Sequence, residues 1–324
     1  MPAEVIMRRK TVTAIALVLS LVGAGVILGQ RTGSSSQSPR GKAPVQTDGI
    51  TPASLDSPSK EYIYAGGRLI ATEEPPPNAS SGSSTPGLYN PATAAFFLRN
   101  SNSGGVADIT LAFGPAGLGW IPIAGDWNGD GVTTIGLYDP TQGAFFLRNS
   151  NTSGIADVTF YFGPAGLGYR PIVGDWNGDG TDSIGLYDPG AGAFFLRNSN
   201  TSGVADITFN YGPASLGYLS ISGDWNGDGA DSIGLYDPVN GAFFLRNTNT
   251  GGIADITFNY GPAGLGFKPL AGDWNGDGSD TIGLYDPTNA TFFLRNSNTS
   301  GIADISFIYG PPGLIPLAGD WDGL

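Results

Sequence analysis

The sequence predicts an all-β protein whose main body is a five-bladed β-propeller, and three observations carry this prediction. Turn residues are abundant, with 52 Gly and 24 Pro among 324 residues, and only 13% of the residues are charged. Phe, Tyr, Ile and Thr recur in short runs between clusters of Gly, Asn and Asp, which is typical of short strands joined by turns. The same landmarks return every 49 residues, which indicates a repeat architecture.

Composition excludes several kinds of chemistry. The chain contains no Cys and no His, which removes disulfides, zinc-thiolate sites, thiol nucleophiles and the commonest catalytic base. Residues 1–86 carry a net charge of +2, whereas residues 87–324 carry −15. A body of that sign repels phosphates and anionic lipid headgroups and attracts cations, so we expect no nucleic-acid partner.

Residues 1–30 are expected to form a signal peptide or signal anchor. The basic run Arg8-Arg9-Lys10 precedes an uncharged, mostly apolar segment, Thr11–Gln30. The segment is long enough to span a bilayer and has no sharp cleavage site, so cleavage and retention both stay open. Either outcome predicts a secreted or cell-surface protein that meets the membrane only through this segment.

Two linkers and a hairpin are expected between the export segment and the repeats. Residues 31–60 and 75–86 are rich in Ser, Gly, Pro and Thr without hydrophobic periodicity, which is typical of linkers. Between them, residues 61–74 contain two alternating apolar runs around Gly66-Gly67, which predicts a β-hairpin.

The repeats occupy residues 87–324. The segment GDWNGDG begins at four positions spaced 49 residues apart, and a shortened fifth copy, GDWDG, begins at Gly319. Each unit divides into four short strands, for example TIGLYD, AFFLRN, ADVTFYFG and RPIVGDW, and four strands per repeat suit a propeller blade. The five units are 87–135, 136–184, 185–233, 234–282 and 283–324.

The two ends of the array predict a closed ring. The array begins at Gly87 without the loop that precedes this strand in other units, and it ends at Trp321 without the strand that follows. Pairing these ends would complete one composite blade. An open solenoid, the alternative, would leave two strand edges that need caps.

The DWNGDG segments are candidate calcium sites. In the first copy, oxygen-bearing side chains stand at alternate positions, Asp126, Asn128 and Asp130, and Gly131 follows where the chain must turn. This pattern is typical of the start of a calcium-binding loop, although Asn-Gly and Asp-Gly also form metal-free tight turns. The other predicted ligands are Asp175, Asn177, Asp179, Asp224, Asn226, Asp228, Asp273, Asn275 and Asp277.

These repeats resemble FG-GAP and VCBS-type blades, the calcium-binding blades of integrin α-subunit propellers. The resemblance covers residues 87–324 and is most specific at GDWNGDG followed by an apolar strand. It implies a propeller and bound Ca²⁺. The family pattern has an Asp at position 9 of the loop, where this chain has Thr or Ser, and in three copies the acid stands one place earlier, at Asp182, Asp231 and Asp280.

The Trp of each loop and the Arg of each FFLRN segment are expected to have structural roles. The Trp residues could stack on sugars, but packing is the expected role, and each Arg is expected to pair with an Asp of its own blade. The pairs Trp120-Ile121, Tyr169-Arg170, Tyr218-Leu219 and Phe267-Lys268 differ between repeats and mark a rim where ligand choice could lie.

The sequence favours a non-catalytic role. Every candidate catalytic group belongs to a motif copied around the array, whereas catalysis needs groups in unlike environments. We therefore expect an exported, calcium-stabilised binding or adhesion module with a surface glycan or protein as ligand. A purely structural scaffold and a propeller-type carbohydrate-active enzyme are the alternatives.

Overall fold

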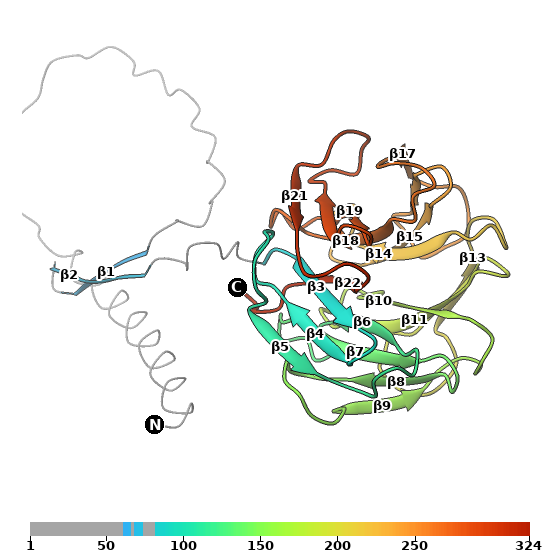
Figure 1. Cartoon of the computed structure of the whole chain (residues 1–324), viewed down its shortest axis with the longest axis horizontal. Coiled ribbons are helices and arrows are strands. Elements are labelled where there is room, and N and C mark those ends of the chain that lie inside the picture. The colour runs from blue at the N-terminus through green and yellow to red at the C-terminus, as the bar shows by residue number, and fades with distance from the viewer. Residues whose placement is uncertain (1–60, 66–67, 74–81) are drawn as a thin grey trace, which may run out of the picture. The chain divides into compact units, whose positions relative to one another are not determined.

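The computed structural model describes residues 61–65, 68–73 and 82–324, and within these residues the fold is all-β (Figure 1). Strands β1 (Glu61–Ala65) and β2 (Arg68–Glu73) pair antiparallel, over the residues expected to form a hairpin. The expected export segment 1–30, the linker 31–60 and residues 74–81 lie outside the described residues. No helix in the described part of the chain is long and apolar enough to span a bilayer.

From residue 82 onward the chain forms five antiparallel sheets of four strands each, which confirms the predicted propeller. Within each blade the strands are named here from the propeller axis outward. They are β22 (Ile315–Gly319), β3 (Thr85–Asn90), β4 (Ala95–Leu98) and β5 (Ile109–Ala112); β6 (Ile121–Gly125), β7 (Thr134–Asp139), β8 (Ala144–Leu147) and β9 (Val158–Tyr161); β10 (Arg170–Gly174), β11 (Ser183–Asp188), β12 (Ala193–Leu196) and β13 (Ile207–Asn210); β14 (Leu219–Gly223), β15 (Ser232–Asp237), β16 (Ala242–Leu245) and β17 (Ile256–Asn259); β18 (Lys268–Gly272), β19 (Thr281–Asp286), β20 (Thr291–Leu294) and β21 (Ile305–Ile308).

The five innermost strands form a closed ring around the axis. Strands β6, β10, β14, β18 and β22 each pack beside the next, and β22 packs beside β6. The ring closes because β22, at the end of the chain, pairs with β3, near its beginning, with Leu317 opposite Gly87 and Gly319 opposite Thr85. The predicted closure through one composite blade is confirmed.

Every blade combines strands from two sequence units, which are successive in four blades and are the last and the first in the fifth. The last strand of each unit, such as RPIVG, crosses to the axis and becomes the innermost strand of the next blade. An eight-residue loop, Phe162–Tyr169 between β9 and β10, makes one of these crossings from the rim to the axis. Because each unit contributes to two blades, neighbouring blades are joined covalently as well as by packing.

The core lies between the blades and is built from repeated aromatic pairs. Phe145 is fully buried and packs against Tyr138 and Phe160, with ring centroids 4.6 and 5.4 Å away. The next residue, Phe146, faces the opposite side of the sheet and stacks on Trp120 at 4.5 Å. The strand is apolar on both faces because each sheet is covered by a neighbour on both sides.

Antiparallel order gives the propeller two different faces. The DWNGDG loops, which join the first and second strands of four blades, lie at one end of the strands, here called the loop face. The Asp-Pro turns, which join the second and third strands, lie at the opposite end, here called the turn face. The loop face therefore carries all the predicted metal ligands.

Candidate metal centre

Each DWNGDG loop leaves the innermost strand of a blade and returns into the second strand. In the first copy the loop follows β6 and precedes β7. Gly129 and Gly131 have φ values of +69° and +84°, a left-handed conformation that a residue with a side chain rarely adopts. The two glycines of the motif are thus needed for the tight turn itself, with or without a bound ion.

The first Asp of each loop organises the turn. Asp126 Oδ1 accepts the backbone N–H groups of Gly129 and Asp130 at 2.8 and 3.2 Å, and Oδ2 accepts the N–H of Gly131 at 2.7 Å. The same hydrogen bonds recur at Asp175, Asp224 and Asp273. This carboxylate is held by main-chain donors, so its position at the centre of the loop is preformed.

The second Asp and the Asn lie at the exposed tip of the loop. Asp130 Oδ1 accepts the N–H of Val132 at 3.0 Å, and Asn128 Nδ2 donates to Asp130 Oδ2 at 2.9 Å. The other three complete loops repeat this contact between amide and carboxylate. In each copy the structure brings the three predicted ligand side chains of one loop together.

The donor set of a loop fits a hard cation, because all its side-chain donors are oxygens. Each loop offers two carboxylates and one amide, and main-chain carbonyls and water would have to supply the rest of a six- to eight-oxygen shell. Among the described residues no three acidic side chains gather into a metal-binding cluster. The amide must also turn its oxygen inward to bind a cation, because its nitrogen now faces Asp130.

Positions 8 and 9, counted from the first Asp of each loop, make structural contacts within the propeller. The position-9 hydroxyls are buried and donate to the carbonyl of the blade Arg, as Thr134 does to Arg148 at 2.7 Å and Ser183 to Arg197 at 2.6 Å. The position-8 acid Asp182 leaves its own loop and faces the preceding blade. A third acidic ligand from the same loop is therefore missing from this arrangement.

The residue at position 8 instead forms hydrogen bonds to the neighbouring blade, a role that sequence reasoning missed. Asp182 Oδ2 accepts the backbone N–H of Asp126 at 2.7 Å, and the N–H of Asp182 donates to the carbonyl of Asp126 at 2.8 Å. The same reciprocal pair occurs at each of the five blade junctions. The other four pairs are Asp231 with Asp175, Asp280 with Asp224, Ser84 with Asp273, and Thr133 with Asp320.

The three position-8 acids form an electrostatically strained group. Burial is the largest cause of their raised pKa values, and the nearby loop carboxylates add to it. The pKa is raised to about 7 for Asp182 and for Asp280, and the pKa of Asp231 is also well above its ordinary value. Asp182 and Asp231 also line a cavity of about 270 Å³ at the loop-face end of the axial channel.

The loop Trp residues pack beneath the loop face, which confirms the expected structural role. All five are 2–5% exposed, and the Nε1 of Trp274 donates to the carbonyl of Thr281 at 3.1 Å. A ring buried this deeply cannot present a face to a sugar. The Trp instead anchors the start of each loop to the core between the blades.

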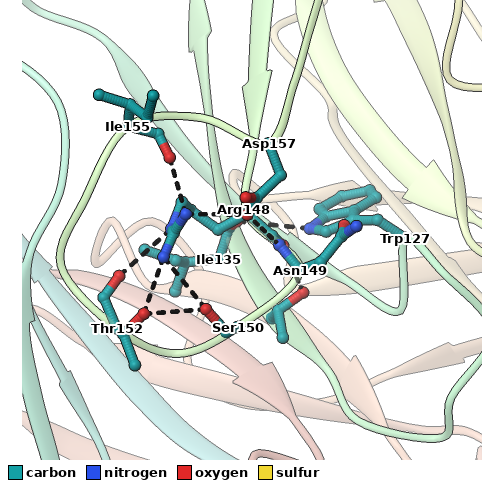
Figure 2. Close-up of polar contacts among 9 residues, drawn as sticks. Trp127, Ile135, Arg148, Asn149, Ser150, Thr152, Ile155 and Asp157 are labelled. Atoms are coloured by element: carbon teal, nitrogen blue, oxygen red, sulfur yellow. Dashed lines mark hydrogen bonds and ion pairs between the residues drawn. The ribbon is translucent and has the colours of Figure 1, made fainter.

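The recurring Arg organises the second loop of the loop face (Figure 2). Arg148 Nη1 donates to the carbonyl of Ile155 at 2.7 Å and pairs with Asp157 at 2.9 Å, and Nη2 donates to Thr152 Oγ1 at 2.7 Å. Equivalent ion pairs occur in every blade, which confirms the predicted pairing of Arg with a blade Asp. One side chain thereby holds a ten-residue loop in a single conformation.

Comparisons with known proteins provide no assignment. No protein-family model matches the chain, and no curated protein is similar to it. The five-bladed, four-stranded propeller is shown by the fold itself, whereas membership of the FG-GAP or VCBS family is supported only by the repeated motif.

Proposed function

We propose that this protein is an exported, calcium-stabilised propeller that acts as a non-catalytic binding or adhesion module at the cell surface. The observation that carries the proposal is the repetition of one preformed oxygen-donor loop four times on a single face. Neighbouring loops touch, since a Cβ placed on Gly129 would lie 2.9 Å from Thr181 Oγ1 of the next blade. Four acidic loops are thus arranged in a ring on the loop face.

A structural role for calcium follows from the charges of this ring. Each complete loop holds two carboxylates close together, and Asp320 and Asp322 add two more. A divalent cation would remove the repulsion between them and stabilise the folded state by mass action. Extracellular calcium modules commonly bind at about 10⁻⁴–10⁻³ M, a range that suits the export predicted from residues 1–30.

A non-catalytic role is supported by the equivalence of the blades. The four complete loops share the same ligand residues and hydrogen bonds, so none of them is set apart from the others as a single catalytic centre. Several equivalent sites suit binding by avidity, in which individually weak contacts act together. The proposed partner is therefore a surface glycan or a protein with repeated features.

Two measurements test the proposal. Calorimetric titration of the full chain with Ca²⁺ should give uptake of about four ions and a higher melting temperature that a chelator reverses. Binding to a glycan array and to cells should then be compared with and without chelator. Absence of calcium uptake would contradict the metal assignment, and absence of binding in both conditions would contradict the adhesion role and leave a structural scaffold.

A further inference from the structure

A second cavity lies on the propeller axis toward the turn face, and it shares Pro171, Ser220, Pro269 and Pro316 with the first. Its volume is about 480 Å³, and residues from all five innermost strands line it. The first residue of each of these strands contributes to the wall, namely Ile121, Arg170, Leu219, Lys268 and Ile315. Four of these positions, those of Ile121, Arg170, Leu219 and Lys268, belong to the pairs that the sequence singled out as differing between repeats.

Two basic residues at this cavity break the fivefold pattern. Residues 87–324 contain seven basic side chains, and five of them are the blade Arg residues, each paired with an Asp of its own blade. The remaining two are Arg170 and Lys268. In the other three blades the equivalent position is Ile or Leu, so neither charge is needed to build an innermost strand.

Neither charge is neutralised by the described part of the protein. No described carboxylate lies within the 4 Å of an ion pair from Arg170 or Lys268, and none of the residues that line the cavity is acidic. Arg170 Nη1 donates only to the carbonyl of Tyr218, at 3.3 Å. In a body with a net charge of −15, these two cations line one cavity and have no described carboxylate within ion-pair distance, whereas each of the five blade Arg residues has one.

The wall of the cavity is mostly apolar, and Ser220, in the blade between the two cations, contributes its only other polar side chain. Pro171, Pro269 and Pro316, each the second residue of its innermost strand, line the cavity and have no N–H to donate, and Ile or Leu occupies the first position of the other three strands. Such a cavity offers two charged donors for an anionic group and an apolar surface for the rest of the ligand.

We propose that the turn-face end of the channel binds a small organic anion, with a carboxylate or sulfate group held by Arg170 and Lys268 and a compact apolar body against the proline walls. The two cations stand in blades separated by a single blade, that of Leu219, so one anionic group on the axis can meet both. This site is separate from the calcium loops, and its occupation requires no metal.

The test uses cyclohexanecarboxylate as the probe and the isosteric neutral cyclohexanecarboxamide as its control, with affinities measured on the full chain by ligand-observed NMR. Replacement of either cation by Leu, which another blade already carries at this position, should leave the melting temperature unchanged. Arg170→Leu and Lys268→Leu should each weaken carboxylate binding roughly tenfold, and Lys268→Arg should retain it. The amide should bind at least about tenfold more weakly than the carboxylate.

Asp130→Asn, on the opposite face, is the matched control and should leave the affinity for the carboxylate unchanged. Raising the salt concentration from about 0.05 to about 0.5 M should weaken binding to the unmodified protein, which provides a test that needs no variant. The proposal is overturned if the carboxylate shows no saturable binding, if the amide binds as tightly, or if binding survives in the folded double Leu variant.

Discussion

The two faces of the propeller place the same residue type, Asp, in opposite electrostatic situations. On the loop face, burial and neighbouring carboxylates raise the pKa values of Asp182, Asp231 and Asp280. On the turn face, burial also acts to raise the pKa of Asp286, but hydrogen bonds donated by Thr288 and Asn289 outweigh it and lower the pKa below its ordinary value. The pKa of Asp237 is lowered for the same reason.

The difference shows that depth of burial and the number of hydrogen-bond donors together decide whether the charge of a carboxylate stabilises the fold. A turn-face Asp accepts several hydrogen bonds from its own Asp-Pro turn, so its anion is favoured. A position-8 Asp on the loop face accepts one backbone N–H and lies among other acids. The carboxylates of the turn face are therefore stabilised by their own turns, whereas the loop face has excess negative charge that a cation could offset.

The largest loss of stability is expected on replacing the aromatic residues that pack beneath each face. Trp225→Ala beneath the loop face should lower the free energy of unfolding by about 3–5 kcal/mol, because the ring is 5% exposed and its loss leaves a large cavity. Tyr218→Ala near the turn face should cost about 1–2 kcal/mol, because this ring is only half-buried and stacks on Phe244. Urea denaturation of both variants measures the difference. Equal losses would contradict the view that the Trp residues are the main anchors of the loop face.

A smaller loss of stability is expected when the pH is raised. In calcium-free protein the carboxyl of Asp280 has a pKa of about 7, above the unfolded value of about 3.9. Its contribution to stability is fully present below pH of about 4 and is lost as the pH rises through about 7, a loss on the order of 2–4 kcal/mol. Asp280→Asn stays neutral, so its stability should change less over this range.

Asp286→Asn is the control, because the contribution of Asp286 to stability depends on pH in the opposite direction. The lowered pKa of Asp286 stabilises the fold above the unfolded value, and this contribution is lost as the pH falls through the folded value. The variant should be less stable than the native protein at neutral pH and should converge with it in acid. Melting temperatures recorded across the pH range distinguish the two variants. If melting temperature depends on pH in Asp280→Asn as it does in the native protein, the raised pKa of Asp280 is contradicted.

The smallest change in stability is expected on removing one carboxylate from a single calcium loop. Asp130→Asn takes one of two carboxylates from a single loop, so ion uptake should fall from about four to about three. The calcium-dependent gain in stability should fall by about 1.4 kcal/mol at a calcium concentration tenfold above Kd. Asp139→Asn on the turn face should leave uptake unchanged. Calorimetry and melting with calcium measure both variants, and unchanged uptake in Asp130→Asn would contradict the assignment of Asp130 as a calcium ligand.

Much of the fold could be predicted from the repeat itself. The 49-residue period, the four strands per unit and the complementary ends led to a closed five-bladed ring, because strand edges in such an array must be paired. The buried Trp and the Arg–Asp pairs also followed from local pattern. The position of Asp182 could not be predicted, because one place along a loop decides whether a carboxylate faces its own turn or the next blade.

By itself, the sequence determined the local elements, because strands, tight turns and oxygen-rich loops depend on residues close together in the chain. Tertiary structure alone decided which residues meet across blades. It joined Asp126 to Asp182, 56 residues apart, and brought Arg170 and Lys268 to one axial cavity. Such contacts depend on the angle between sheets and on the closure of the ring, and these are set by the packing of all five blades together.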